Sequence, residues 1–394
     1  MSYPAFDSKT FLEAHIEKTM AFYFPTCIDP EGGFFQFFKD DGSVYDPNTR
    51  HLVSSTRFIF NFAQAYLHTN IAEYKHAAVH GIQYLRQRHQ SQSGGYVWLL
   101  DGGTNLDETN HCYGLAFVIL AYSNALQIGL SEAEVWIEVT YDLLETHFWE
   151  NKHGLYLDEI SSDWKTVSPY RGQNANMHMC EALMSAFDAT QNPKYLDRAK
   201  LLAKNICQKQ ASLSNSNEVW EHYTNDWQID WDYNKNDPKH LFRPWGFQPG
   251  HQTEWAKLLL MLDKRSPENW YLPKAKYLFD LAYKKAWDTK KGGLHYGYAP
   301  DGTVCDPDKY FWVQAESFAA AWLLYKATKD ETYYKQYLTL WEFSWNHMID
   351  HTFGAWYRIL DENNAQYDNN KSPAGKTDYH TMGASYEVLK TLTL

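Results

Sequence analysis

The sequence predicts an all-α protein: a single (α/α)6 barrel in which six inner helices are ringed by six outer helices, with short β-hairpin-like segments at one rim. Three observations support this fold class. A glycine-rich aromatic segment recurs six times, an almost wholly apolar helix follows each copy, and a more amphipathic helix precedes each copy. An internal repeat of near-constant length is the signature of a repeat architecture. No linker or low-complexity tract interrupts residues 1–394, so they are expected to form one domain.

The six segments show the residue alternation of a short strand. They begin at Glu31, Ser93, Lys152, Glu218, Lys291 and Phe353. Their second residues, at positions 32, 94, 153, 219, 292 and 354, are separated by 62, 59, 66, 73 and 62 residues. The fourth segment lacks the glycine and is the weakest match. An open array of helix pairs is the alternative, but a tetratricopeptide unit has only about 34 residues, and six units are the number that closes a barrel.

Helix signals fill the intervals between these segments. Apolar helices are expected to begin near Ser55, Cys112, Asn176, Gln252, Gln314 and Thr381. Stretches such as Leu115–Leu126 and Phe318–Tyr325 are apolar almost all round, which predicts buried inner helices. The amphipathic outer helices are expected at Lys9–Phe24, Ile71–His89, Glu132–Trp149, Pro193–Gln208, Pro267–Trp287 and Glu331–Met348. Proline suits the first position of a helix, so Pro193 and Pro267 mark two of the starts.

The composition excludes several classes of partner. The formal net charge is −12, which argues against nucleic acid and against an anionic membrane surface. No run approaches the roughly 18 apolar residues of a membrane span, and residues 1–10 lack the basic start and apolar run of a secretory signal. Five dispersed cysteines without a C-x-x-C pair indicate reduced thiols, so a cytoplasmic protein is expected. The 16 Trp and 29 Tyr are expected mostly in the core, although both types also suit a pocket that stacks on sugar rings.

Polar residues recur where the inner helices are expected to begin, at the rim that would form a single cup. In chain order they are Arg57; Asn110, His111 and Tyr113; Asn174, His178 and Glu181; Arg243, His251 and Glu254; Gln314 and Glu316; and His380. His178, His251 and His380 are expected at the same phase of the repeat, which favours a functional role for all three. Glu181 and Glu254 each follow a histidine by three residues, and are expected to orient the imidazoles and adjust their pKa values.

The two His-x-x-Glu pairs also raise the question of a metal site, since facing helices carry such pairs in helical-bundle metal centres. In neighbouring inner helices each glutamate would lie about one turn deeper than its histidine, which disfavours joint ligation. No phosphate loop, dinucleotide fingerprint or set of cysteine ligands is present. Neither a metal nor an organic cofactor is therefore expected.

Three motifs resemble those of the N-acylglucosamine 2-epimerase superfamily of sugar epimerases and isomerases, and the resemblance spans the whole chain. They are Arg171-x-x-Asn174-x-x-Met177-His178-x-x-Glu181, Pro249-Gly250-His251-x-x-Glu254-Trp255 and Tyr379-His380. The 2-epimerases typically continue the last motif as Tyr-His-Asn-x-Arg, whereas this chain continues with Thr381-Met382-Gly383-Ala384. In lacking that arginine the chain resembles the aldose–ketose isomerase branch, which includes mannose and sulfoquinovose isomerases.

The resemblance implies an aldose–ketose isomerase that interconverts D-mannose and D-fructose through a cis-enediol(ate). One base can remove the proton from C2 and return it to C1, a task that suits an imidazole with a pKa near neutrality. By similarity, His380 is that base, and His251 is the acid/base partner for ring opening and for the oxygen protons. The resemblance assigns sugar binding and stabilisation of the enediolate charge to Arg57, Asn110, Tyr113, Asn174, His178, Arg243, Glu254, Trp312 and Glu316.

Other interpretations stay open on the sequence alone. A sulfoquinovose isomerase needs a basic cluster at C6, which Arg57 or Arg243 would have to supply. An N-acylglucosamine or cellobiose-type 2-epimerase needs protonation from the opposite face of the intermediate. An inverting (α/α)6 glycoside hydrolase needs two carboxylates about 6.5–9.5 Å apart, for which Glu254, Glu316 and Asp107 are candidates. A non-catalytic sugar-binding protein would not need matched histidines. The expected partner is a monosaccharide, and both a monomer and a homodimer remain open.

Overall fold

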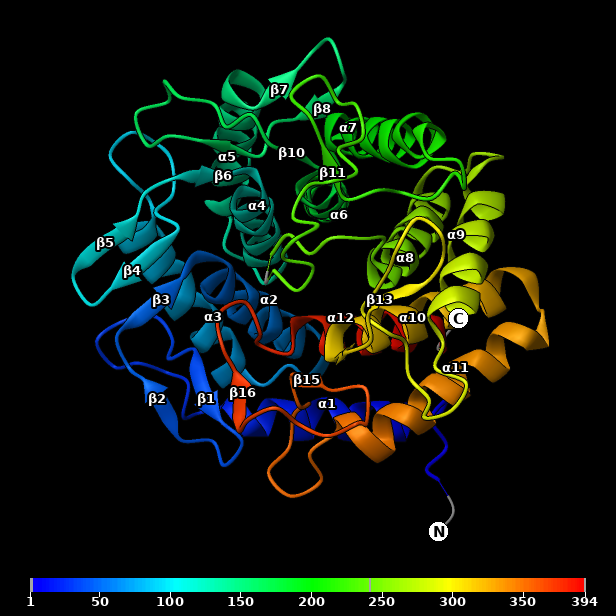
Figure 1. The fold of residues 1–394 in the computed structure, drawn as a ribbon. Helices are drawn as coiled ribbons and strands as arrows, with labels where there is room; N and C mark the ends of the chain where they lie inside the picture. The colour runs from blue at the N-terminus through cyan, green and yellow to red at the C-terminus, as the bar shows by residue number, and fades with distance from the viewer. Residues whose placement is uncertain (1–2, 241, 393–394) are drawn as a thin grey trace.

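Two concentric rings of helices form the barrel (Figure 1). The computed structural model describes residues 3–240 and 242–392. Over that part of the chain the inner ring is α2 (Leu52–Thr69), α4 (Cys112–Gln127), α6 (Gln173–Thr190), α8 (Pro249–Arg265), α10 (Phe311–Thr328) and α12 (Tyr379–Leu392). Each inner helix packs against the next one around the ring, and α12 closes the ring against α2. The predicted (α/α)6 barrel is confirmed, and every inner helix begins within three residues of its predicted start.

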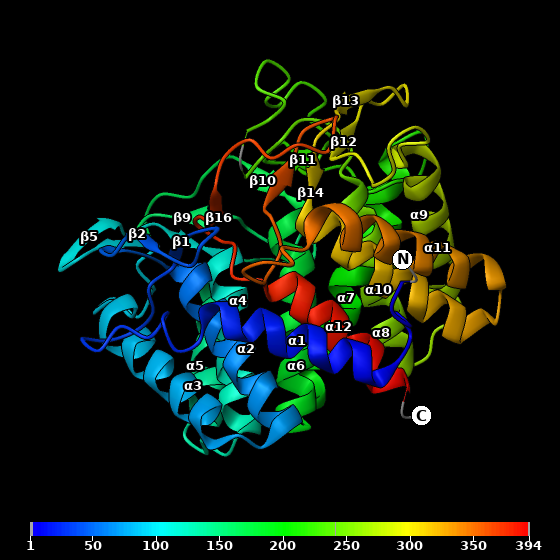
Figure 2. The same cartoon turned by 90° about the horizontal axis from the view of Figure 1, so that it is seen from below.

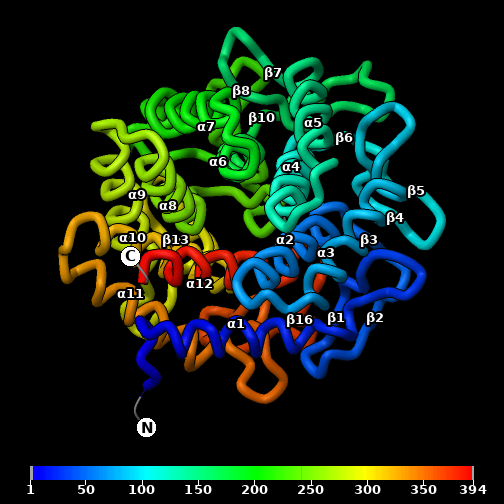
Figure 3. The backbone as a smooth tube through the Cα atoms, turned by 180° about the vertical axis from the view of Figure 1, so that it is seen from behind, coloured from blue at the N-terminus to red at the C-terminus, as the bar shows by residue number. Residues whose placement is uncertain are grey.

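The outer helices lie outside this ring, as the view from behind shows (Figure 3). They are α1 (Lys9–Tyr23), α3 (Ala72–Tyr84), α5 (Ala133–His147), α7 (Pro193–Lys204), α9 (Tyr271–Ala286) and α11 (Glu331–Phe343). From α3 onward each outer helix packs on the inner helix that precedes it in the chain, and α1 covers α12. Short π-helical turns extend α3, α7 and α11 over Leu85–His89, Asn205–Gln210 and Ser344–Met348, and a 3-10 turn follows at Ala211–Leu213.

One predicted helix start is wrong. The sequence predicts that α9 begins at Pro267, but the helix begins at Tyr271. Local bonds hold the intervening residues in a turn: Tyr271 N donates to Glu268 O (3.1 Å), and Trp270 Nε1 donates to Glu268 Oε2 (2.8 Å). Pro193, by contrast, does occupy the first position of α7, and Asn192 caps that helix by accepting from Lys194 N.

The inner helices are buried on almost every face, because outer helices cover one side and neighbouring inner helices cover the others. Residues 115–125 of α4 and 318–324 of α10 are all buried. Large aromatic side chains fill the space between the rings, and the fully buried tryptophans are Trp220, Trp227, Trp255, Trp341 and Trp356. Burying one large apolar side chain stabilises the fold by about 1.5–3 kcal/mol. These tryptophans confirm that many aromatic residues serve the core.

Short strands gather at one rim of the barrel (Figure 2). They are β1 (Phe37–Lys39), β2 (Val44–Asp46), β3 (Thr49–His51), β4 (Leu99–Asp101), β5 (Thr104–Asp107), β6 (Asn110–His111), β7 (Trp149–Glu150), β8 (Leu155–Tyr156), β9 (Glu159–Ile160), β10 (Arg171–Gly172), β11 (His222–Tyr223), β12 (Gly297–Tyr298), β13 (Val304–Asp306), β14 (Lys309–Tyr310), β15 (Ile359–Leu360) and β16 (Asn370–Ser372).

All the strand pairs are antiparallel, and several join one repeat to the next. β3 pairs with β4, β6 with β9, β10 with β11, and β14 with β15. In each of these pairs the first strand leads directly into an inner helix. β16 pairs with β1, which ties the last repeat to the first at the rim. These pairs tie repeats together at the rim and place the starts of α2, α4, α6 and α10.

A side-chain amide near the start of an inner helix holds the hairpin of the same repeat. Asn176 accepts from Tyr156 N (2.8 Å) and donates to Tyr156 O (3.0 Å). Gln252 and Gln314 make the same two bonds to one hairpin residue each, at 2.7–3.1 Å. We call this set of three side chains the amide clamp. Because these amides are buried, each bond satisfies a backbone group that water does not reach.

The amide clamp aligns the repeats residue by residue and corrects one prediction. His178, Glu254 and Glu316 each stand two residues after a clamping amide, so they occupy equivalent positions. His251 stands one residue before Gln252. The prediction that His178 and His251 occupy equivalent positions in their repeats is therefore wrong, because the two are offset by three residues relative to the clamping amides. The hairpin backbone binds the amide and not the histidine, so the amide defines the equivalent position.

Two further observations concern the described residues as a whole. Among them, no helix has both the length and the apolar character needed to cross a bilayer. The five cysteines are free thiols, and all except Cys305 are buried.

Candidate active site

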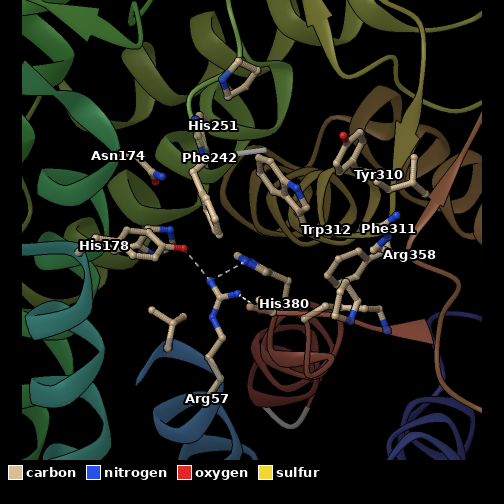
Figure 4. Close-up of a pocket in the computed structure, with 18 of the residues that line it drawn as sticks. Arg57, Asn174, His178, Phe242, His251, Tyr310, Phe311, Trp312, Arg358 and His380 are labelled. Atoms are coloured by element: carbon tan, nitrogen blue, oxygen red, sulfur yellow. Dashed lines mark hydrogen bonds between the residues drawn. The ribbon is translucent and has the colours of Figure 1, made fainter. Parts of the chain in front are cut away.

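A pocket opens at the rim that carries the strands, where the six inner helices converge (Figure 4). Together with the open space at its mouth it takes in about 870 Å³. Eight of the eleven predicted site residues line it: Arg57, Tyr113, Asn174, His178, His251, Glu254, Trp312 and His380. Every inner helix contributes at least one of them through its first two turns. The repeat thus brings together residues that are far apart in the sequence.

His380 is held between a carboxylate and a guanidinium. Its Nδ1 lies 2.7 Å from Glu316 Oε1, and its Nε2 lies 3.3 Å from Arg57 Nη2. A guanidinium only donates hydrogen bonds, so Nε2 carries a lone pair and Nδ1–H donates to Glu316. Burial holds the pKa of His380 well below its ordinary value, and the nearby charges of Arg57, His178 and Lys257 lower it further. His380 is therefore a neutral imidazole whose Nε2 lone pair faces Arg57 at the pocket.

His251 is oriented in the same way by a different residue from the one predicted. Its Nδ1 lies 2.9 Å from Glu221 Oε2, and the same oxygen accepts from Gln173 Nε2 (2.9 Å). Glu254, the predicted partner, points toward His178 instead, with its Oε1 3.9 Å from His178 Nδ1. Since the carboxylate fixes Nδ1–H, Nε2 is the nitrogen that His251 leaves for a ligand.

Trp312 stands between the two imidazoles. The centroid of its ring system lies 5.0 Å from the ring centroid of His251 and 5.6 Å from that of His380. Figure 4 shows these three rings side by side along one wall of the pocket. The indole thus separates the two histidines and offers an apolar face of the kind on which sugar rings stack.

Arg57 is fixed in a buried position beside His380. Its guanidinium donates to Gly375 O and to Tyr113 Oη (3.0 Å). It also lies over the aromatic rings of Phe117 and Tyr379, with centroid distances of 4.4 and 4.9 Å. A guanidinium held in this manner presents positive charge without the entropic cost of ordering a free side chain.

Below the pocket lies a group of buried carboxylates. His178 Nδ1 is 3.6 Å from Glu181 Oε2, so these two residues are neighbours as predicted. Burial lowers the pKa of His178 to about 4, against the opposing effect of Glu181. Both carboxyl oxygens of Glu254 are buried and make no hydrogen bond to the described residues. Burial raises the pKa of Glu254 well above its ordinary value, and the charge of Glu316 adds to this effect.

These donors come closer together than the sequence suggests. Ligand atoms of His178, Glu181 and Glu254 lie within 4.8 Å of one another, as do those of Glu254, Glu316 and His380. A buried ammonium, that of Lys257, already stands beside two of the glutamates. The expectation that the protein uses no metal and no organic cofactor stays a prediction.

Three predicted site residues do not line the pocket. Glu316 lies behind His380 and acts on it directly. Asn110 is buried in the rim, where it accepts from Tyr96 N (3.0 Å) and donates to Ser161 O. Its amide is therefore engaged by backbone groups of its own hairpin and of the next repeat. Arg243 lies in an adjoining hollow that shares Tyr113 and Asn174 with the pocket, and its guanidinium is paired with Glu159.

The structure adds pocket residues that the sequence reasoning missed. Arg358 and Lys376 bring two further cations to the wall, and Phe242 reaches in from the loop before α8 (Figure 4). Lys376 donates to Asp378 Oδ2 (2.5 Å), and burial lowers its pKa to about 8 although Asp378 opposes the shift. None of the three stands at a recurring position near a helix start, so the repeat pattern holds no signal for them. Glu221, the partner of His251, lies in the fourth hairpin segment, and nothing else in the sequence marks it as a site residue.

Comparison with known proteins matches this geometry to a family. The N-acylglucosamine 2-epimerase (GlcNAc 2-epimerase) family model matches residues 33–384. A D-mannose isomerase of Thermobifida fusca is 33% identical over 289 residues, which cover 72% of this chain and 71% of that protein. A crystal structure of D-mannose isomerase is 97% identical, with a TM-score of 0.96 over 99% of this chain and 100% of the other. A cellobiose 2-epimerase from Spirochaeta thermophila DSM 6192, 23% identical with a TM-score of 0.85 over 98% of both chains, shares the fold.

The chain belongs to the N-acylglucosamine 2-epimerase family. Within that family it is an enzyme of the sugar isomerase class, as are the relative at 33% identity and the structure at 97% identity. The resemblance drawn from the three sequence motifs is therefore confirmed.

Proposed function

We propose that the protein interconverts D-mannose and D-fructose through a cis-enediol(ate), with His380 and His251 as its acid/base groups. One observation carries this proposal: each imidazole is bonded through Nδ1 to a buried glutamate, so Nε2 is the nitrogen that can meet the sugar, and in His380 it also lies 3.3 Å from Arg57. Two oriented imidazoles in one pocket suit a reaction that moves protons and does not require a strong nucleophile. The names of the two D-mannose isomerases support the choice of sugar.

The proton transfers follow from the positions of these groups. With the open-chain aldose bound, His380 Nε2 takes the proton from C2, the C2–H electron pair forms the C1–C2 double bond, and negative charge develops on O1. Arg57, 3.3 Å from the same nitrogen, stabilises that charge. His251 moves the hydroxyl proton from O2 to O1, and the imidazolium of His380 returns its proton to C1. Both carbon transfers use one nitrogen, so they occur on one face of the intermediate.

The remaining charges of the pocket favour an uncharged hexose over a sulfonated one. Lys376 is already bonded to Asp378, and the Arg358 guanidinium lies 3.7 Å from Asp368. Neither cation is therefore left to neutralise a sulfonate. Position 383 holds a glycine where the 2-epimerases typically have an arginine, which also disfavours epimerisation.

An inverting hydrolase is disfavoured by the spacing of the carboxylates. Ligand oxygens of Glu254 and Glu316 lie within 4.8 Å of each other, whereas that mechanism needs about 6.5–9.5 Å to admit a water molecule. Glu316 is also occupied by His380 and by Lys257. The five unpaired cysteines fit a reducing compartment, so we further propose that the enzyme acts in the cytoplasm on a free monosaccharide.

Proton NMR tests the proposed function directly. The purified, EDTA-treated protein is incubated with D-mannose in D2O, with sulfoquinovose and N-acetylglucosamine as parallel substrates. We expect D-fructose that carries deuterium at C1, because the proton held by His380 exchanges with solvent between the two transfers. Fructose without deuterium would require a shielded proton or a hydride transfer in place of this route. No turnover of mannose, or faster turnover of either parallel substrate, would overturn the proposal.

The pH dependence of kcat/KM should show an acid limb far below neutrality. The active form of His380 is neutral, and its folded pKa lies well below the ordinary histidine value of about 6.5. Activity is therefore present above that lowered pKa and is lost as the pH falls through it. We expect kcat/KM to change little between pH 7.5 and about 6, as measured by initial rates with circular dichroism at each pH to verify folding. A decline that begins near pH 7 would contradict a neutral, depressed His380.

A further inference from the structure

Lys257 is a buried cation that the mechanism above leaves without a role. It continues the inner face of α8 after His251 and Glu254, each separated by three residues. Its side chain is 4% exposed, and its Nζ lies 2.6 Å from Glu316 Oε2 and 3.5 Å from Glu181 Oε1. Glu316 in turn accepts from His380 through its other oxygen. An unbroken line of contacts therefore runs from Lys257 through Glu316 to the imidazole.

We propose that Lys257 is a positioning residue for the isomerisation: its ammonium keeps Glu316 ionised, and Glu316 thereby fixes the His380 tautomer whose Nε2 is free to act as the base. The role assigned to His380 rests on the proposed function. The contacts from Lys257 to His380 do not depend on that function.

The charges around Lys257 explain why a cation is needed there. The groups that face it are Glu181 and His178 on α6, Glu254 on α8, Glu316 on α10, His380, Tyr379 and Glu387 on α12, and Arg57 on α2. Three carboxylates buried together repel one another strongly unless a cation or a proton neutralises them. Arg57 is engaged by Gly375 O and Tyr113 rather than by these carboxylates. Lys257 is therefore the cation that contacts Glu316 and Glu181.

The balance of effects on Glu316 shows what removal of Lys257 would do. Burial raises the pKa of Glu316, and Lys257 is the strongest influence that opposes the rise. Burial also disfavours the charged form of Lys257, but Glu316, Glu181 and Glu254 together raise its pKa, so the ammonium stays charged. Without that charge, Glu316 would take up a proton.

A protonated Glu316 would reverse the hydrogen bond to His380. Its O–H would donate to Nδ1, and the imidazole would then carry its proton on Nε2. The nitrogen beside Arg57 and the sugar would have no lone pair, so it would be unable to accept the proton from C2. In a catalytic triad, replacement of the carboxylate that fixes the histidine tautomer lowers kcat by about 10⁴-fold. Here Glu316 would remain in place and would only become protonated.

The surroundings of Lys257 allow a conservative variant. A second hollow, which takes in about 660 Å³ together with its open mouth, lies further along the barrel axis toward the C-terminal ends of the inner helices, and Lys257, Glu181, Glu316 and Tyr379 line it. The ion-paired side chains thus form a partition between the two hollows. Because space lies below Nζ, an arginine at this position has room for its guanidinium.

The test compares Lys257→Met, Lys257→Gln and Lys257→Arg with the parent protein. We expect both neutral variants to lose about 10²–10⁴-fold in kcat, with little change in KM because Lys257 does not line the sugar pocket. The acid limb of kcat/KM should move to higher pH by about one unit or more. Lys257→Arg should recover most of the kcat. Nitrogen-15 NMR of the histidine side chains should show His380 protonated on Nδ1 in the parent and on Nε2 in the neutral variants.

Lys285→Met is the matched control, since Lys285 Nζ lies 2.5 Å from the buried Glu218 Oε2 and neither residue lines the pocket. This variant should lose stability while its kcat and pH profile stay unchanged. A folded Lys257→Met or Lys257→Gln with kcat within about threefold of the parent would overturn the proposal, and so would an unchanged His380 tautomer. The NMR measurement needs no turnover. It can therefore test the role of Lys257 even if the proposed sugar isomerisation is wrong.

Discussion

Replacement of His380 by glutamine is expected to abolish isomerisation, with kcat reduced by at least about 10³-fold. The imidazole accepts and returns the carbon-bound proton, and an amide has no basic nitrogen with which to do so. Glutamine keeps a donor near Glu316 and a similar volume, so the pocket should retain its shape. Initial rates of fructose formation give kcat, and calorimetric titration with mannose gives the affinity that should persist.

His15→Gln is the control for this experiment. His15 is also buried and bonded to an aromatic residue, since it accepts from Trp356 Nε1 (3.0 Å), but it lies on α1 outside the pocket. Its variant should unfold at a lower temperature and yet keep its kcat. If His380→Gln retained more than about a tenth of the parent kcat, the base would have to be sought elsewhere, with His251 as the first alternative.

Replacement of Arg57 by methionine is expected to lower kcat by about 10²–10³-fold, the usual effect of losing one preorganised donor to a developing oxyanion. The substitution removes the only guanidinium within hydrogen-bond distance of His380 among the described residues. It should affect kcat more than KM, because the charge it stabilises appears only as the C2 proton leaves. Steady-state kinetics with mannose and with fructose measure both parameters.

A half-buried arginine provides the comparison. Arg198 pairs with Glu145 and lies over the Trp149 ring at 3.4 Å, on the outer helix α7. Arg198→Met should cost stability through lost packing and leave kcat unchanged. Equal kcat losses in both variants would mean that Arg57 acts through the fold and has no direct part in stabilising the enediolate.

The fold was predictable because local rules and the repeat agree along most of the chain. Apolar runs such as 115–125 and 318–324 have no side that suits water, so only an inner ring accommodates them. The predicted start of α9 is wrong because short-range bonds to Glu268 hold the preceding residues in a turn.

The site was predictable only for residues that belong to inner-helix starts. His178, His251 and His380 do, and all three line one pocket. Glu221 and Arg358 lie in hairpin segments and not at inner-helix starts, so the recurrence of polar residues at helix starts does not include them. Asn110 is predicted to bind the sugar but binds the backbone of a hairpin. A sequence does not distinguish these two uses of a side-chain amide.

The amide clamp has a consequence for the ancestry of such barrels. A unit that holds its own hairpin through its own helix can be duplicated within a gene without inventing a new contact for each copy. When the copies close into a ring, the residue two places after the amide faces the common axis each time, as His178, Glu254 and Glu316 do. A barrel that arose by such duplication would carry equivalent side chains around its axis, and substitutions at these axial positions offer a route to a different reaction.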